Sequence, residues 1–517
     1  MLLEQNDFAS SSAYNLKLQT ELNAQPPSDV KQARLNSNEA SILMRIAPHL
    51  ARPTPVVKPL YKQDASQHKF LGLGLAMSLQ ELLGADLESA ARQRKLTSKK
   101  RVLSKRECLE FLPNLPQQGL VGGMSFYDLG VDNPERLALG FLKSAAQIGG
   151  DLANYAQVVG FMRERGRVIG VKVRDQLTSQ YFEVQAKTII ISAGIWTAKL
   201  QRLLLGEEAR EPQRFIKATH LITRPIFETY TVSLQGYQRD QAYSFAPLHD
   251  HTIISTKHTL YEGEAQIPEI SQQEIDRLLQ EINQIYPPAQ LTRSDVTSVW
   301  SRLIPLADQV SESRALALGD QAKATQIQPN YIDGVVIAQC VSPRMIRQNA
   351  VSTLDQVFRL WGHKPIESFS AMTPLRGGEV QNFEDFIDCE LAANPWKLRH
   401  EMLIQVIHNY GTDYARVLEY LPKRRLGASL EEETKAVLYA QIYHAIHKEM
   451  ALKLTDIVFR RTALGVTEQP SADILKFCAQ TMGRILNWRD SQIEQAIYEV
   501  NAAFSWKIEK VSSQSGF

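Results

Sequence analysis

Apolar positions follow different spacings in different parts of the chain. Residues 154–175 alternate apolar and polar side chains, with many β-branched residues, as is typical of half-buried strands. Thr188 to Ser192 is a continuous apolar run, which indicates a buried parallel strand. Leu137 to Gln147 has helical spacing, and from about Glu379 onward helical spacing predominates. The pattern predicts an α/β body followed by an α-helical C-terminal region.

Three further segments complete this outline. Asn36 to Leu50 is predicted to form a helix that Pro53 and Pro55 end, and an extended segment follows. Residues 213–305 contain several strand-like runs and predict a second sheet region, and Gly334 to Cys340 predicts one more strand. No internal repeat or low-complexity tract interrupts the outline.

The first four residues raise a question about a nucleotide site. Met1-Leu2-Leu3-Glu4 has the form of a buried strand that ends in an acid, which usually comes second in a dinucleotide-binding unit. No strand and glycine loop precede it. Gly72-x-Gly74 lies in an apolar helical stretch, without a preceding strand or a third glycine, so helix packing is the better interpretation.

Composition narrows the function classes. A chain of 517 residues suggests roughly two to four domains, and its net charge of +2 implies no strong field for a polyanion or a membrane. The four cysteines form no C-x-x-C pair, which favours a reducing compartment and disfavours a zinc site. We expect no secretory signal, because Glu4 and Asp7 interrupt the start, and no spanning helix.

One basic run stands out from this even composition. Arg92 to Arg106 reads "RQRKLTSKKRVLSKR", either a solvated helix and turn or a patch that touches anionic lipid headgroups. The run has few aromatic residues, so we expect no nucleic-acid partner.

A series of longer motifs resembles a known family. "LLEQNDFASSS", "NEASILMRIAPHLARP", "GLVGGMSFYDLGVDNPERLALGFLKSAAQIGG", "ISAGIWT", "RFIKATHLI" and "LYEGE" occur in this order. Together they resemble the FAD-dependent glycerol-3-phosphate dehydrogenase family. The tail, from "NPWKLRHEMLIQVIHNYGTDYARVLEYL" to "LYAQIYHAIHKEMALKLTDIVFRRTALG", resembles that family's C-terminal helical domain.

The resemblance implies an α/β fold class. Residues 1–370 would form an FAD-binding Rossmann-like domain, incomplete at its N-terminus, with an inserted β-rich substrate domain at about 205–305. Residues 371–517 would form an all-α C-terminal domain. In the family a strand and a G-x-G-x-x-G loop precede the acid that Glu4 matches. A misplaced start, a truncated gene and a protein that no longer needs the loop all remain open, and we expect an unpaired apolar sheet edge.

The resemblance also implies FAD as cofactor. Glu4 would bind the adenosine ribose, the Val158 backbone would face the adenine, and the turn after residue 192 would lie near the phosphates. The residues assigned to FAD in this way are Glu4, Ser10, Ser11, Val158, Ala193, Gly194 and Ser342. No metal site is expected.

Candidate catalytic residues follow from the same resemblance. His220 would be the base that takes the substrate hydroxyl proton, with Lys217 and Arg344 as phosphate or charge partners. Ser342 and Arg344 survive in a segment whose family glycine pair and lysine are replaced here by Ile337, Ala338 and Gln339.

Other positions depart from the family pattern. Ile304 stands where an arginine that contacts the substrate is expected, and an apolar side chain cannot form a phosphate fork. Lys257 and His258 replace a hydroxylated and acidic lining with a basic one. "AYNLKLQTELNAQ" stands where the family has a His-Gly-Gly stretch against the flavin, a place where glycines allow close backbone approach.

Three functions therefore remain open. The first is an FAD-dependent oxidation of sn-glycerol 3-phosphate to dihydroxyacetone phosphate, with electrons passed to a quinone or another acceptor. The second is a non-catalytic paralogue without tight FAD, and the third is a flavin oxidoreductase with a changed substrate. We expect a small-molecule substrate and a cytoplasmic location, with peripheral contact at the inner membrane face as an open alternative. The sequence does not predict the oligomeric state.

Overall fold

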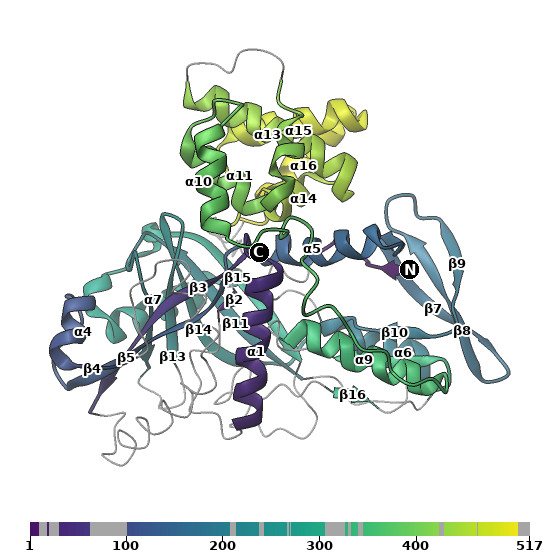
Figure 1. The fold of residues 1–517 in the computed structure, drawn as a ribbon, viewed down its shortest axis with the longest axis horizontal. Coiled ribbons are helices and arrows are strands. Elements are labelled where there is room, and N and C mark those ends of the chain that lie inside the picture. Colours follow the sequence, from purple (N-terminus) through teal and green to yellow (C-terminus); the bar gives the residue numbers. More distant parts are fainter. Residues whose placement is uncertain are drawn as a thin grey trace, which may run out of the picture.

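A computed structural model describes most of the chain. The described residues are 1–9, 18–19, 30–62, 101–206, 214–236, 242–265, 268, 270–305, 326–328, 332–339, 345–422, 429–462 and 464–504. Figure 1 shows a broad α/β body with a helical domain standing on it.

The largest element is a nine-stranded mixed sheet, which contains the predicted sheet region of residues 213–305. Its order is β15-β11-β14-β13-β12-β3-β5-β2, with β4 paired to β5. The strands are β2 (Leu18–Gln19), β3 (Ala51–Tyr61), β4 (Arg101–Ser104), β5 (Leu120–Val131), β11 (Phe215–Thr223), β12 (Thr231–Gln235), β13 (Ala242–Leu248), β14 (His251–Tyr261) and β15 (Val296–Pro305).

One face of this sheet is covered by helix α7 (Gln272–Ile285). Its N-cap Ser271 accepts a hydrogen bond from the Glu274 backbone N–H, which satisfies one of the free donors of the first turn. The buried side chains of α7 recur at helical spacing and pack with Leu221 and Val299 of the sheet. They are Ile275, Leu278, Leu279 and Ile282. The sheet also contacts α1 (Val30–Ile46) and α4 (Lys105–Phe111).

The N-terminal side contains smaller sheets. Strand β1 (Leu2–Leu3) pairs in parallel with β6 (Leu152–Ala153), and β10 (Ile189–Ile191) pairs in parallel with β17 (Val335–Gln339), which also pairs β16 (Gln326–Gln328). A three-stranded antiparallel sheet adjoins them, made of β7 (Ala156–Glu164), β8 (Arg167–Asp175) and β9 (Tyr181–Gln185). Helices α5 (Pro134–Gln147), α6 (Thr197–Leu205) and α9 (Ile346–Leu360) complete this side.

The two parallel pairs lean on the same antiparallel sheet. Leu3 and Ile189 both pack around Val171 and Val173 of β8. Their neighbours on the other side of each strand are exposed, with Leu2 at 41% and Ile190 at 42% of its surface. These exposures concern the outer faces of the strands, and the unpaired apolar edge stays a prediction.

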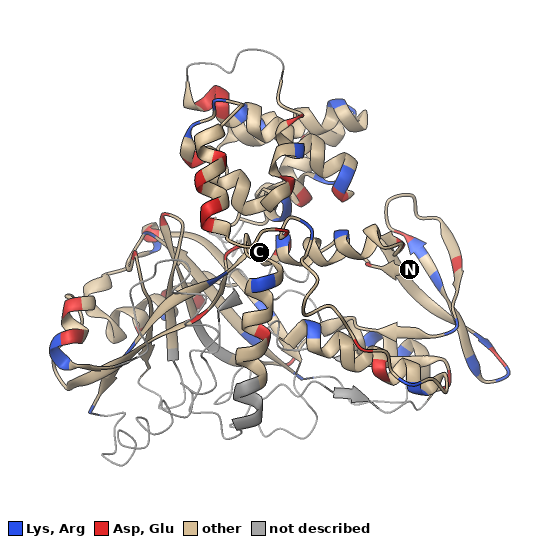
Figure 2. Ribbon diagram, in the orientation of Figure 1, with Lys and Arg blue, Asp and Glu red and all other residues tan. Residues whose placement is uncertain are grey.

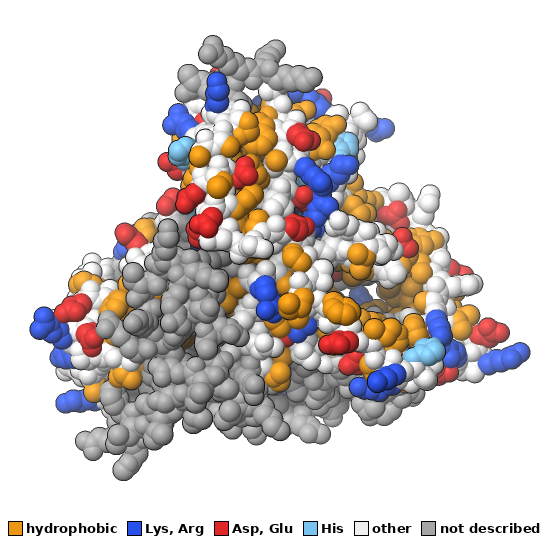
Figure 3. All heavy atoms as spheres, viewed as in Figure 1, with side chains coloured by type: hydrophobic (Ala, Val, Ile, Leu, Met, Phe, Trp, Pro, Cys, Tyr) orange, Lys and Arg blue, Asp and Glu red, His pale blue; other side chains and the backbone are white. Residues whose placement is uncertain are grey.

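Apolar side chains also gather beyond α9. Figure 3 shows orange side chains over α9 and the segment that follows it. The exposed residues there are Leu354, Leu360, Ile366, Phe369 and Met372.

The C-terminal domain is helical, as predicted. Its elements are α10 (Phe383–Ala393), α11 (His400–Tyr410), α12 (Tyr414–Leu418), α13 (Leu430–Glu449), α14 (Leu454–Asp456), the π-helical turn η9 (Ile457–Arg461), α15 (Ala472–Leu486) and α16 (Asp490–Ala502). Two apolar clusters form its core, one around α11 and α12 and one around α13, η9 and α15. Figure 2, a ribbon coloured by residue type, shows that acidic residues recur along α10.

Several sequence predictions need new bounds. The helix predicted at 36–50 is α1, residues 30–46, so it ends before Pro53 and Pro55, which lie inside the extended strand β3. Of the basic run 92–106, residues 101–106 are described and form strand β4 and the start of α4, so this part is a strand and a helix start, and residues 92–100 lie outside the described ranges. Within the described ranges, no helix is long and apolar enough to cross a membrane.

Candidate active site

Strand β11 carries the predicted catalytic histidine on one of its two faces. Side chains of a strand alternate between faces, and residues directly opposite on a neighbouring strand share a face. His220 lies opposite Ser255 of β14 and Trp300 of β15. Its Nδ1 atom is 3.0 Å from Ser255 Oγ, so the serine can fix the tautomer of the ring. His220 is therefore held in place by a neighbouring strand.

Arg302 lies on the same face and was missed from the sequence. It is directly opposite Ala218, two residues from His220 along β11, so Arg302 and His220 are diagonal neighbours. Burial lowers the pKa of Arg302 to about 10, which still leaves a cation at neutral pH. Ile304 follows two residues later on this face and is buried. The signal was present in the sequence, since residues two apart in a strand point the same way.

Lys217 points to the opposite face. It is three residues from His220, and alternation turns it towards α7, where its Nζ donates to Glu274 Oε2 over 2.7 Å. Thr219 Oγ1 donates to the other oxygen of the same carboxylate at 3.1 Å. The structure thus does not bring Lys217 and His220 together. The phosphate role of Lys217 stays a prediction that this pairing disfavours.

Glu4 ends strand β1, as the sequence predicted. Its backbone N–H donates to Ala153 O at 2.9 Å, and its carbonyl accepts from Ala156 N–H at 2.8 Å. The carboxylate Oε1 accepts from Asn6 N–H at 3.0 Å. Burial raises the pKa of Glu4, although the hydrogen bond from Asn6 opposes the shift. The segment from Glu4 onward is thus fixed on both sides by backbone bonds.

Ala193 and Gly194 form the turn between β10 and α6. Gly194 has φ of +54°, and the space where a Cβ atom would lie is open. The turn at Gly194 to Trp196 also contacts β15, the strand that carries Arg302. Val158 lies in β7, opposite Val173, and packs in the cluster that contains Leu3. Glu4, Val158 and the turn therefore belong to one side of the molecule.

The remaining predicted residues lie outside the described ranges. These are Ser10, Ser11, Ser342 and Arg344. The side chains of Lys257, His258 and Gln339 are likewise not described. Within the described part of the chain, no cluster of three or more His, Cys, Asp or Glu side chains could hold a metal ion.

The described residues fit one half of an FAD molecule better than the other. Glu4 offers a carboxylate at a strand end for a ribose, and the open space at Gly194 allows a ligand close to the backbone. No G-x-G-x-x-G loop follows β1 or β10 to take a pyrophosphate. The fit is to the adenosine half.

Comparison with known proteins supplies the family. A family model described as FAD dependent oxidoreductase matches residues 2–340. The chain belongs to the FAD-dependent oxidoreductase family, whose cofactor is FAD. A second model, the C-terminal domain of alpha-glycerophosphate oxidase, matches residues 368–493 of this FAD-dependent oxidoreductase.

Individual relatives agree with these models. The chain is 25% identical to an alpha-glycerophosphate oxidase of Enterococcus casseliflavus, over 97% of this chain and 90% of the relative. It is 31% identical to the alpha-glycerophosphate oxidase of Streptococcus pneumoniae, over 59% of this chain and 50% of the relative. A glycerol-3-phosphate dehydrogenase of Mycobacterium leprae is 25% identical over 89% of this chain and 75% of the relative.

A solved structure confirms the fold. The glycerol-3-phosphate dehydrogenase from Bacillus halodurans, complexed with FAD, superposes with a TM-score of 0.75 at 21% identity. The match covers 98% of this chain and 89% of that one. The mixed α/β body with an all-helical C-terminal domain is thus the architecture of a known flavoprotein.

Proposed function

We propose that this FAD-dependent oxidoreductase oxidises sn-glycerol 3-phosphate to dihydroxyacetone phosphate. The observation that carries the proposal is the sheet face that holds His220, Ser255 and Arg302 and is joined through β15 to the turn at Gly194. The family model for the C-terminal domain and the names of the relatives point to the same substrate.

Each residue on this face has a distinct task. Nδ1 of His220 is engaged by Ser255, so we assign to Nε2 the removal of the proton from the substrate's C2 hydroxyl. Arg302 supplies a planar guanidinium, which can hold two phosphate oxygens at once. It takes the place that Ile304 cannot fill. FAD, when bound, supplies the acceptor for the hydride that leaves C2.

On the cofactor side, Glu4 is proposed to bind the adenosine ribose, with the Val158 backbone facing the adenine and the Ala193–Gly194 turn near the phosphates. Ser10, Ser11, Ser342 and Arg344 remain assigned by resemblance. A quinone is the proposed final electron acceptor. Because relatives are named oxidases, dioxygen is the second acceptor to test beside it. The proposed location is the cytoplasm.

Membrane contact would involve the basic run. In its described part, the Arg106 side chain is 91% exposed and pairs with Glu110 one helical turn later, while Lys105 donates to Gln117 O. Sedimentation with anionic vesicles, at low and high salt, tests this contact, because headgroup attraction is screened by salt.

The decisive experiment mixes the FAD-loaded protein with sn-glycerol 3-phosphate in the absence of oxygen. Bleaching of the flavin's visible band, with dihydroxyacetone phosphate formed in equal amount, supports the proposal. Bleaching by another hydroxy or amino acid substrate, but not by glycerol 3-phosphate, would favour the changed-substrate alternative. A protein that takes up no FAD would overturn the proposal.

Arg302 is tested in the same assay. Arg302→Leu should raise KM for glycerol 3-phosphate about 10- to 100-fold, because a charge-assisted bond to the phosphate is lost. Arg302→Lys keeps the charge but not the fork, and should fall between the parent and the leucine variant. An unchanged KM in both variants would remove Arg302 from the phosphate site.

A further inference from the structure

The short segment that carries Glu4 is tied to the far end of the sequence. Asp7 is buried, with no part of its side chain exposed, and Arg461 of η9 binds both of its oxygens. Nη1 of Arg461 is 2.7 Å from Oδ2, and Nη2 is 2.9 Å from Oδ1. Arg460 adds Nε at 2.7 Å from Oδ2. The result is a carboxylate held by two guanidiniums of the helical domain.

Electrostatics favour this arrangement in its charged form. Burial alone would raise the pKa of Asp7, but Arg461 and then Arg460 outweigh burial and hold the pKa below its ordinary value. A bidentate guanidinium–carboxylate pair also fixes direction, because two parallel bonds resist rotation. Asp7 therefore stays in one place.

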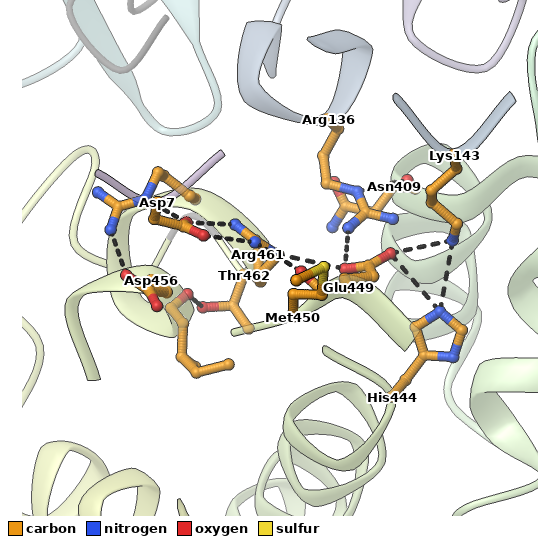
Figure 4. Close-up of polar contacts among 12 residues, drawn as sticks. Asp7, Arg136, Lys143, Asn409, His444, Glu449, Met450, Asp456, Arg461 and Thr462 are labelled. Carbon is orange, nitrogen blue, oxygen red and sulfur yellow. Dashed lines mark hydrogen bonds and ion pairs between the residues drawn. The ribbon is translucent and has the colours of Figure 1, made fainter. Parts of the chain in front are cut away.

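Arg461 is itself anchored from its other side. Figure 4 shows it between Asp7 and Glu449. Its Nη2 also donates to Glu449 O at 2.9 Å, and the Glu449 carboxylate accepts from Arg136 Nη1 at 2.7 Å and from Lys143 Nζ at 3.0 Å. Both of these donors lie on α5. The Asp7–Arg461 pair is thus supported by the helical domain and by α5 together.

A second set of hydrogen bonds connects the helical domain to Asn154 and Tyr155, just before strand β7. Tyr155 donates its hydroxyl to Asp456 Oδ1 at 2.7 Å, and the backbone N–H of Tyr155 donates to Asn6 O at 2.9 Å. The side chain of Asn154 donates to Asp7 Oδ1 at 3.2 Å and to Met450 O at 2.9 Å. Asn6, in turn, holds the Glu4 carboxylate through its backbone N–H. Hydrogen bonds of 2.7 to 3.2 Å, together with the covalent chain at residues 6–7 and 154–155, thus connect the helical domain to Glu4.

From this chain of contacts we infer that the C-terminal domain is a clamp for the cofactor-binding segment. Arg461 and Asp7 act as positioning residues that hold the Glu4 carboxylate where the ribose binds. The inference rests on the proposed FAD site, and it gives the helical domain a role in cofactor affinity although none of its described residues has been assigned to the cofactor.

Two measurements on Arg461→Met and Asp7→Asn test the clamp separately from catalysis. Hydrogen exchange should speed up at the amides of Glu4, Asn6, Tyr155 and Ala156. The dissociation constant for added FAD should rise about tenfold, the usual order for losing a group that orients a ligand-binding side chain. Arg376→Met is the matched control, because it breaks a pair with Asp413 in the same domain without touching residues 1–9.

Each outcome decides one half of the inference. Faster hydrogen exchange with unchanged FAD affinity would overturn the cofactor role and leave a structural clamp. Exchange at the parental rate in both variants would overturn the clamp. A parent chain that takes up no FAD would overturn the proposed function, while the exchange result would still decide the clamp. If the single variants do not fold, the double variant Asp7→Asn/Arg461→Met removes both charges and serves the same two measurements.

Discussion

The substrate sheet and the sheets of the cofactor side are built very differently. In the nine-stranded sheet, β11 is paired on both sides along its whole length, and all nine of its residues are buried. On the cofactor side, β1 and β10 each pair with one described neighbour, and Leu2 and Ile190 remain over two-fifths exposed. His220 is thus fixed by its own sheet. Glu4 is held by backbone bonds to residues 153–156, and the segment that carries it is tied at Asp7 to guanidiniums of the helical domain.

The comparison shows which contacts hold the site residues in place in the substrate sheet and on the cofactor side. A residue in the middle of a wide sheet needs no special partner, because its neighbours on both sides define its place. A residue at the end of a two-residue strand has almost no such support. Here the side-chain pair of Asp7 and Arg461 and the backbone N–H of Asn6 supply it.

The largest expected effect comes from the substrate sheet. His220→Asn keeps a similar shape but removes the base, so kcat should fall about a thousandfold, within the usual range for general-base catalysis. Single-turnover reduction of the flavin by glycerol 3-phosphate measures this step. Ser255→Ala should give a smaller loss, because it removes only the partner of Nδ1. A His220→Asn variant with parental kcat would place the base elsewhere.

Lys217→Met tests the other face of the same strand. It leaves the Glu274 carboxylate without its ammonium partner, and we expect the free energy of unfolding to fall by about 3 kcal/mol, as for other half-broken buried pairs. Urea unfolding measures the loss, and Lys217→Met/Glu274→Leu should recover part of it. If kcat falls as far as in His220→Asn while stability is kept, Lys217 serves the substrate after all.

The pH dependence of stability separates two buried or half-buried glutamates. Glu274, beside the substrate sheet, is paired with Lys217, whereas burial raises the pKa of Glu135, on α5, from 4.5 to about 7. Between these values the folded protein keeps a proton that the unfolded chain releases, so stability is lost as pH rises from about 4.5 through 7. Glu135→Gln should therefore be more stable than the parent at pH 8, by roughly 2 kcal/mol, and no more stable at pH 4. Unfolding curves at the two pH values decide this.

The smallest effect is expected at the exposed edge. Ile190→Thr should change the free energy of unfolding by less than about 0.5 kcal/mol, as is usual for surface positions. Ile216→Thr, in β11, should cost about 2 kcal/mol or more, because it puts a hydroxyl into the core. Equal losses at both positions would mean that the two sheets are supported alike.

Much of the fold could be predicted from local pattern. The run at 188–192 contains β10, the helix at 137–147 is α5, and the region from about Glu379 onward is helical, because each pattern depends only on near neighbours. The sheet face on which each site residue lies could also be predicted from the sequence. Alternation along β11 separates Lys217 from His220, and alternation along β15 joins Arg302 to Ile304.

The contacts of Asp7 could not be predicted in this way. Its partner Arg461 is 454 residues away, and no periodicity or spacing connects the two. The pairing depends on how the helical domain docks against α5 and β1, which is a property of tertiary packing. Glu4 was predicted from the strand pattern at residues 1–4 and from the resemblance, whereas the contacts of Asp7 with the helical domain were found only in three dimensions.

The Asp7–Arg461 pair also sets an order of events during synthesis. Asp7 is made near the start, and its main partner is added 454 residues later. At usual elongation rates this interval is on the order of half a minute. During this interval the segment around Glu4 is attached to the ribosome-bound chain and lacks its contact with Arg461. The nascent protein therefore acquires a settled cofactor segment only after η9 has been made.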